Sequence, residues 1–323
     1  MENNGLFGLS WLRNEGPFDL ENLVSLKDWN SECGPVWIDM DRDSDIAEKW
    51  LYQISGLDPI VCDALLAEDT RPRRELFDDG VMIILRGVNL TGEEDAGEMI
   101  SLRMWFDSNR VITIRRYEFQ SLNLVRQSIQ SSRGPKTTSD FLINLVEKIC
   151  DLTEPVLDDL NETIDQLGDR ILNEDLDGLK NDIVASRRKA SALKRYLAPQ
   201  RETISRLCAD PLTWMSDRHF AQLRESVDRI KRYTEDLDLN SNHAGIAQEQ
   251  LINLHNERTN KAMYILSVVA AIFLPLSFIT GLLGINVGGI PGAENPLGFL
   301  IVITVLAGIT SLELMIFRLM KFL

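Results

Sequence analysis

The chain has 323 residues, enough for one to three domains with a substantial core, and its formal charge is −15. After Lys261 only Glu294, Glu313, Arg318 and Lys321 are charged and they cancel, so the negative excess lies before that point. An acidic part of this size argues against a nucleic-acid partner. It can concentrate cations, although the charge by itself is better explained by ordinary solubility.

The cysteines and the N-terminal residues point to a soluble part in a reducing cytoplasm. Four cysteines lie far apart and show no CxxC spacing: Cys33, Cys62, Cys150 and Cys208. They fit buried or free thiols rather than disulfides or a zinc knuckle. The N-terminus, MENNGLFGLS, has no basic region followed by an apolar run, so no signal peptide is expected.

Residues 1–136 are predicted to form an α+β domain. Apolar runs and alternating patterns predict strands at 35–40, 81–85, 100–106 and 111–114, the last two joined as a hairpin, and helices at 44–54 and 59–67. The domain has no nucleotide-binding loop and no nucleophile elbow, so the chain is not expected to be an enzyme.

The following residues, 137–261, are predicted to form a helical hairpin and a stalk helix. Apolar residues three and four apart indicate a helix over 139–172, with Pro155 expected to kink it, and a second, antiparallel helix over 179–208. From about Leu212 a single helix is expected to run on into an apolar segment.

The last part, residues 262–323, is predicted to be a transmembrane domain. Its first span, 262–283, carries no ionisable residue and is long enough to cross a hydrocarbon core of about 30 Å. A loop at 285–296 leads to a second span at 297–319. Basic residues flank the spans only on the side away from this loop, so the positive-inside rule places both termini in the cytoplasm.

One face of the long helix is polar or small, with steps of mostly three and four residues. Its members are Asn242, Glu249, Asn253, Asn256 and Asn260 in the stalk, then Met263, Ser267, Ala270, Leu274, Ser277 and Gly281 in the span. In a bundle of several copies this face makes a poor dry core and a plausible water-filled ion path. Small residues also suit close helix packing, and Leu274 and Met263 could form apolar constrictions.

The first span ends in Gly284-Ile285-Asn286, and the residues VGGIPG follow. A Gly-x-Asn tripeptide after the first of two terminal spans resembles the CorA-type metal-ion transporter superfamily. The isoleucine and the residues after it are similar to the ZntB zinc-transporter branch. The resemblance covers the whole chain and implies a homopentamer in the inner membrane with an axial pore.

The resemblance implies that Gly284, Ile285 and Asn286 form the filter. The amide oxygen of Asn286 is a hard, neutral ligand that can hold a hydrated cation transiently. From the residues alone, a helix C-cap would be the simpler role for Asn286. Glu294, in the loop, would attract divalent cations to the outer mouth, although it could be an ordinary exposed acid.

Two further groups of residues have open roles. Glu313 is an acid inside the second span, where such residues are functional candidates, but a structural pair with Lys261 or Arg258 is the simpler interpretation. Three histidines lie on the predicted stalk without the spacing of a zinc site: His219, His243 and His255.

The sequence therefore predicts inward transport of a divalent cation, and the resemblance implies zinc, with a proton gradient as one possible driving force. No cofactor is implied apart from the transported cation. A CorA-type magnesium or cobalt channel is the alternative within the same architecture. A membrane-anchored sensor or adaptor is the alternative of another class, and the asparagine-rich face counts against it because its stalk should be apolar.

Overall fold

The computed structural model describes residues 6–11, 34–68, 70–90, 99–173, 176–285 and 295–319. The chain divides into two compact units, Met1–Gln248 and Glu249–Leu323. The three-part division expected from the sequence stays a prediction.

The described strands of the first unit form one six-stranded sheet in the order β1-β2-β6-β5-β4-β3. They are β1 (Leu6–Trp11), β2 (Val36–Asp41), β3 (Arg73–Phe77), β4 (Gly80–Val88), β5 (Met99–Phe106) and β6 (Arg110–Arg115). β2 pairs with β6 in parallel and the other pairs are antiparallel, so the predicted β5–β6 hairpin is confirmed. β1 and β3 were not predicted; β3 is an edge strand with partly exposed charged side chains and no apolar run.

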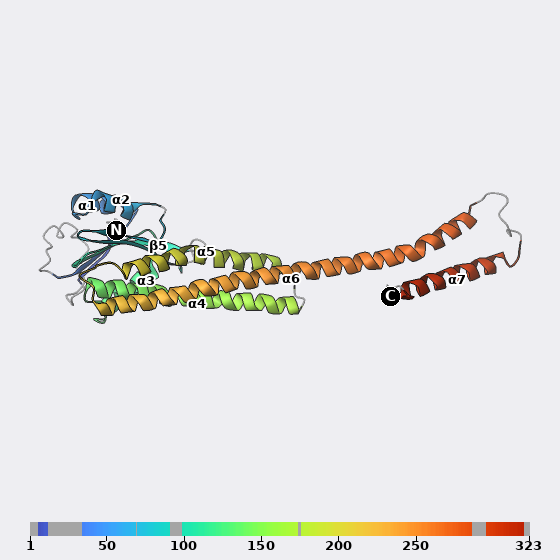
Figure 1. Ribbon diagram of the computed structural model, residues 1–323. Helices are drawn as coiled ribbons and strands as arrows, with labels where there is room; N and C mark the ends of the chain where they lie inside the picture. Colours follow the sequence, from blue (N-terminus) through green and yellow to red (C-terminus); the bar gives the residue numbers. More distant parts are fainter. Residues whose placement is uncertain are drawn as a thin grey trace. The chain divides into compact units, whose positions relative to one another are not determined.

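Both faces of the sheet are covered, which explains the nearly continuous apolar sequence of β4 and β5. Helices α1 (Asp45–Gln53) and α2 (Pro59–Leu66), both predicted, pack on one face (Figure 1). Helices α4 (Thr138–Leu172) and α5 (Leu179–Leu207) contact the other. Helix α3 (Gln120–Gln130) was missed, because it is short, largely polar and has no side-chain cap.

The predicted helical hairpin and stalk are present as α4, α5 and α6 (Asp217–Leu283). α4 continues through Pro155, and the kink expected there stays a prediction. The stalk helix begins at Asp217 and not at Leu212 as predicted. The cause is a turn in which the Met215 N–H donates to the Leu212 carbonyl at 3.0 Å, followed by Ser216, whose Oγ accepts from the N–H of His219 at 3.4 Å.

The second unit contains the end of α6 and α7 (Gly298–Leu319). Each of α6 and α7 has a stretch with a mean hydropathy of 2.3, long and apolar enough to cross a membrane. The two spans expected from the sequence therefore correspond to the end of α6 and to α7.

A buried carboxylate joins the parallel strands β2 and β6 to α3. Asp39 is fully buried, and its carboxylate accepts from Thr113 Oγ1 at 2.7 Å, Arg115 Nη2 at 3.1 Å and Arg126 Nη2 at 2.7 Å. The indole N–H of Trp37 donates to the same threonine hydroxyl at 2.9 Å. The buried Asp39 carboxylate is stabilised only when all its hydrogen-bond partners are in place. The cluster therefore fixes the position of α3 on the sheet.

We predict that Asp39→Asn strongly destabilises the first unit, because it leaves the charges of Arg115 and Arg126 without their carboxylate. The expected cost is about 3–5 kcal/mol, or a loss of roughly 10 °C in apparent Tm, measured by tryptophan fluorescence on the full chain in detergent. The control is Asp43→Asn, which removes half-exposed pairs with Arg116 at 3.0 Å and Arg42 at 2.7 Å and should cost less than about 1 kcal/mol. Equal shifts for the two variants would contradict the prediction.

Candidate functional site

The predicted pore-lining residues all lie on one helix, as the spacing required. The stalk residues from Asn242 to Asn260 and the span residues from Met263 to Gly281 belong to α6, and each is exposed in the single chain. Gly284 and Ile285 follow the helix end directly and are also exposed, with the Gly284 N–H donating to the Thr280 carbonyl at 2.9 Å. Asn286 and Glu294 lie outside the described residues. We call the set from Asn242 to Gly281 the seam.

The seam continues through apolar residues that the sequence analysis missed. Ile246 falls between Asn242 and Glu249 at steps of four and three, and Leu239 precedes Asn242 by three. Their exposed fractions are 53% and 56%, although such side chains are usually buried. A strict alternation of three and four would have identified both residues. This face of α6 therefore carries two apolar residues around Asn242 and is rich in asparagine farther along the helix.

In the first unit, α6 is held against α4 on the side opposite to the seam. Arg229 binds Asp151 at 3.0 Å and Glu154 at 2.8 Å, and the Tyr233 hydroxyl donates to Glu154 at 3.0 Å. Hydrogen bonds from Arg229 and Tyr233 hold the pKa of Glu154 below its ordinary value. This clamp fixes the rotation of the part of α6 that belongs to the first unit, so Asn242 faces away from that unit's core.

In the second unit, most half-exposed positions of the α6 span again lie away from the seam: Tyr264, Val268, Ile272, Leu276 and Ile279. Half-exposed positions of α7 recur with the same spacing: Val302, Leu306, Thr310, Glu313 and Phe317. These are the sides on which the two helices of this unit pack. The seam is left free for other copies of the chain, for water or for lipid.

Glu313 lies on this packed side of α7. Its Oε2 atom is buried and has no hydrogen-bond partner among the described residues. The acid is thus turned towards the helix pair and away from lipid, as is usual for ionisable residues in spans. The basic partner expected from the sequence stays a prediction.

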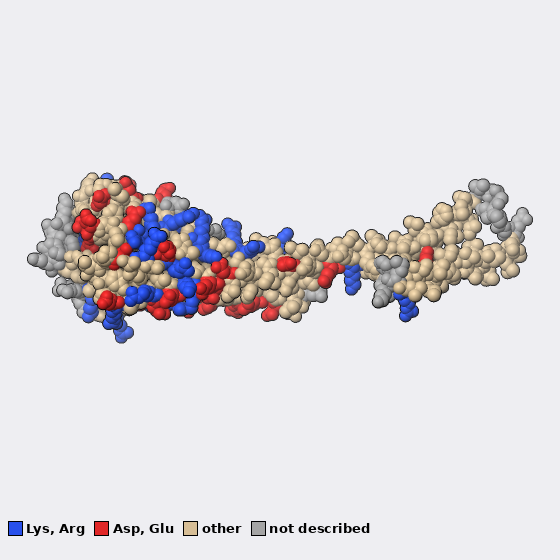
Figure 2. Space-filling view, in the orientation of Figure 1, with Lys and Arg blue, Asp and Glu red and all other residues tan. Residues whose placement is uncertain are grey.

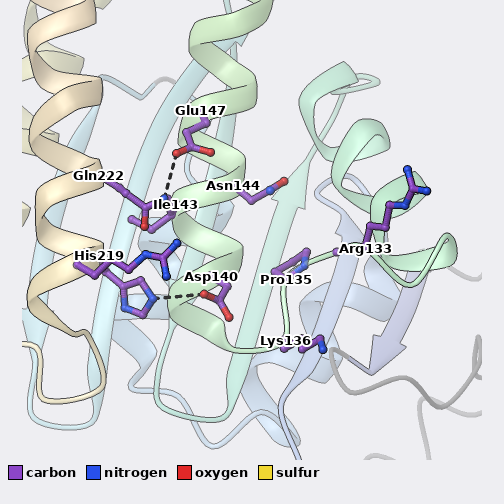
Figure 3. Close-up of a pocket in the computed structure, with 11 residues that line it drawn as sticks. Arg133, Pro135, Lys136, Asp140, Ile143, Asn144, Glu147, His219 and Gln222 are labelled. Atoms are coloured by element: carbon purple, nitrogen blue, oxygen red, sulfur yellow. Dashed lines mark hydrogen bonds and ion pairs between the residues drawn. The ribbon is translucent and has the colours of Figure 1, made fainter.

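A pocket of about 330 Å³ lies between α4, α6 and the segment before α4 (Figure 3). In it, His219 Nε2 lies 3.3 Å from Asp140 Oδ1, and Gln222 donates to Glu147 at 3.4 Å. Across the described residues no group of three His, Cys, Asp or Glu side chains is placed to hold a metal. Within one chain, His219 therefore contributes to no metal centre in the described part.

The described cysteines also offer no soft ligand site. Cys62, Cys150 and Cys208 are free thiols, as expected, and Cys33 lies outside the described residues. Burial raises the pKa of all three thiols, that of Cys150 to about 12. Because the thiolate is the form that binds metals, protonated and separated thiols are poor ligands.

Known proteins resemble this chain over nearly its whole length. The family model described as CorA-like Mg2+ transporter protein matches residues 32–321. The divalent cation transporter CmaX of Pseudomonas aeruginosa is 33% identical over 290 residues, which cover 89% of this chain and 87% of that protein. The zinc transport protein ZntB of Pectobacterium carotovorum is 31% identical over 270 residues, which cover 84% and 82%.

Solved structures agree with this assignment. The structure of the full-length CmaX protein aligns with a TM-score of 0.85 at 31% identity, over 98% of each chain. The CorA magnesium transporter of Methanocaldococcus jannaschii aligns with a TM-score of 0.77 over 88% of this chain and 90% of that one. Its 21% identity supports a common fold only. By the match of the family model and by these relatives, the chain belongs to the family of CorA-like Mg2+ transporter proteins, as the Gly-Ile-Asn tripeptide had indicated.

Proposed function

We propose that the protein carries divalent metal cations inward across the inner membrane, as a homopentamer whose copies of α6 surround an axial pore. The observation that carries the proposal is the seam. It lies on the side of α6 opposite to the residues packed within the chain, and it is polar or small over Asn253–Gly281 except at Met263 and Leu274. A membrane anchor would need no such side. The membership of a transporter family makes a water-filled path its simplest use.

Zinc is the proposed cargo. ZntB relatives are named as zinc transport proteins, and the Gly-Ile-Asn tripeptide with its following residues is similar to that branch. The alternative is magnesium, which the family description names, whereas CmaX is named only for divalent cations. A proton gradient is proposed as the driving force.

Asn286 is proposed as the filter residue at the outer end of the pore. A hydrated divalent ion enters a narrow pore when oxygens replace the water contacts that it strains. A ring of amide oxygens provides these contacts without the deep binding site that carboxylates would create. Gly284, just after the helix end, can support the turn that this requires.

The apolar end of the seam face gives the path a dry cytoplasmic section. Leu239 and Ile246, repeated around an axis, would form apolar rings of the kind that exclude water when narrow. Asn253, Asn256 and Asn260 would keep the adjoining section wet. The sensor or adaptor alternative would instead require an apolar face along the whole stalk.

The ion and the driving force are tested in liposomes that contain the purified protein. We expect labelled zinc to enter faster than labelled magnesium and faster with a pH gradient than without one. Empty liposomes give the background. Faster uptake of magnesium than of zinc would favour the CorA-type magnesium channel. An uptake rate that does not change with the pH gradient would contradict proton coupling.

Asn286→Leu should reduce zinc uptake to background, because the oxygens are lost while the side-chain volume is roughly kept. The oligomer should survive, which mass photometry checks. The matched control is Asn295→Leu in the same loop, whose side chain accepts from the Leu297 N–H at 2.9 Å and is given no role in the filter. Normal flux in Asn286→Leu would remove the filter assignment, and a collapsed oligomer would return Asn286 to a structural cap.

Glu294→Gln provides a contrast with Asn286. Because a ring of exposed acids raises only the local cation concentration, uptake should fall by up to about tenfold at low external metal and little at saturation. The loss should shrink as salt rises, since screening acts over about 8 Å at physiological ionic strength. An equal loss at saturating metal would show a role beyond attraction.

Cysteines on the seam should let a charged thiol reagent block transport. Asn253→Cys, Asn256→Cys and Asn260→Cys, in a background with Cys33→Ser and Cys208→Ser, should lose uptake after reaction from the cytoplasmic side. Leu251→Cys, on the opposite side of the helix, should keep it. Block at Leu251→Cys, or reaction at the seam without any block, would argue against a pore along this face.

A further inference from the structure

Helices α4 and α5 carry opposite charges. α4 has nine acidic and two basic residues, whereas α5 has eight basic and two acidic ones. Figure 2 shows Lys and Arg gathered over α5 and Asp and Glu gathered along α4. A strongly positive helix is unexpected in a chain with a formal charge of −15. Three of its basic residues pair with described acids of the same chain, namely Lys189, Lys194 and Arg206, and the remaining ones are available to a negative partner.

The acids of α4 lie along one side of the helix, with steps of mostly three and four. This acidic stripe consists of Asp140, Glu147, Asp151, Glu154, Asp158, Glu162, Asp165 and Asp169. It lies opposite to the buried residues of α4, such as Leu160, Ile164 and Leu167. Its first half contacts α6 through Arg229. Its last four acids are exposed and make no ion pair with any described residue.

The outer side of α5 carries basic residues that are likewise exposed. We call Lys180, Arg187, Arg188 and Arg195 the basic face. All four are exposed and form no ion pair in the described part of the chain. Among the described residues, Arg187 donates to Gln248 at 3.2 Å, and the Arg195 guanidinium carbon lies 5.6 Å from the ring centre of Tyr196, its neighbour in sequence.

The two charged surfaces lie at the same level of the hairpin. Lys189 binds Asp159 at 3.0 Å and Arg170 binds Asp182 at 2.7 Å, so residues 159–170 of α4 run beside residues 182–189 of α5. These two pairs satisfy the sides on which the helices meet. The acids from Asp158 to Asp169 and the basic residues from Lys180 to Arg188 are left on the outer sides, at matching heights.

Exposed apolar residues accompany both surfaces. The large apolar side chains of α4 and α5 that are exposed in the described structure are Leu172 and Val184, at 80% and 51%. Leu172 continues the line of the acidic stripe at the end of α4, and Val184 lies between the residues of the basic face. Single exposed apolar residues are common. Exposed apolar residues beside two complementary charged surfaces are what a contact between copies would use.

We propose that the basic face of α5 in one copy docks on the acidic stripe of α4 in the next copy of a closed ring. The proposal rests on the homo-oligomer of the proposed function. Every interface of such a ring joins two different surfaces of the same chain, and rotation about the axis keeps each atom at its height. A chain that carries an acidic surface and a basic surface at the same height can therefore provide both surfaces that meet at each interface of the ring. Exposed ion pairs add little affinity, so their effect is to select the neighbour and its register.

Cross-linking of differently tagged copies tests the contact. Glu162→Cys in one chain and Arg188→Cys in the other, both with Cys33→Ser and Cys208→Ser, are co-expressed as full-length protein and oxidised. We expect a disulfide-linked product that carries both tags. The matched control replaces Arg188→Cys by Ile60→Cys, a 64% exposed position on α2, and should give none.

Three outcomes overturn the proposal in different ways. An intact oligomer without the cross-link, or with an equal cross-link at Ile60→Cys, overturns this interface and leaves transport untouched. In that case the basic face becomes available to an anionic lipid surface. A monomeric protein that still transports zinc overturns both this contact and the axial pore.

A charge exchange distinguishes specific pairing from proximity. The reporter is a second cross-link, between Asp165→Cys in one chain and Val184→Cys in the other, which lie at matching heights by the register of the Lys189–Asp159 and Arg170–Asp182 pairs. Adding Lys180→Glu and Arg188→Glu to the second chain should lower its yield by about tenfold. Adding Glu162→Lys and Asp169→Lys to the first chain should then restore the yield to within about twofold. A yield that does not recover, in an oligomer of normal size, would overturn the pairing of these charges.

Discussion

The arrangement depends on one constraint: α6 must keep a fixed rotation about its own axis. Leu223, Ile230 and Leu237 are buried within the first unit, and Arg229 is bound to two carboxylates of α4. Within the first unit, a rotation that moved Asn242 inward would bury its amide and leave Arg229 without its partners, each at a cost of several kcal/mol. The same side of one helix therefore stays outward, and every proposal for the pore depends on it.

Much of the fold followed from hydrophobic spacing, because long helices and buried strands repeat the same signal many times. The α4–α5 hairpin, the spans and the β5–β6 pair belong to this group. The spacing could not reveal β3, whose place at the sheet edge depends on pairing with β4, or the start of α6, which is set by the turn before Ser216. It also could not bring Asp39 together with Arg115 and Arg126, because contacts so distant in sequence leave no local pattern.

The candidate site also has features that could be predicted from the sequence and features that could not. The position of the seam on one face of α6 could be read from spacing, since a helix converts sequence steps into a face. The role of Asn286 could not be predicted from spacing, because asparagine suits both a helix cap and a filter. Only the family resemblance favours the filter. Ile246 was missed although its spacing is right, four residues after Asn242 and three before Glu249. The sequence analysis looked for polar residues on this face, and Ile246 is apolar.

The opposite charges of α4 and α5 also change what the net charge means. Taken over the whole chain, −15 suggests a diffuse acidic surface that could concentrate cations. The two helices nearly cancel each other, however, so the acids of α4 contribute little to the excess. If neighbouring copies pair them, these acids are neutralised where they lie and cannot hold cations at the inner mouth of the proposed pore. In the proposed path, the attraction of divalent ions would then depend on the remaining acids of the soluble part and on Glu294, which is proposed to lie at the outer mouth.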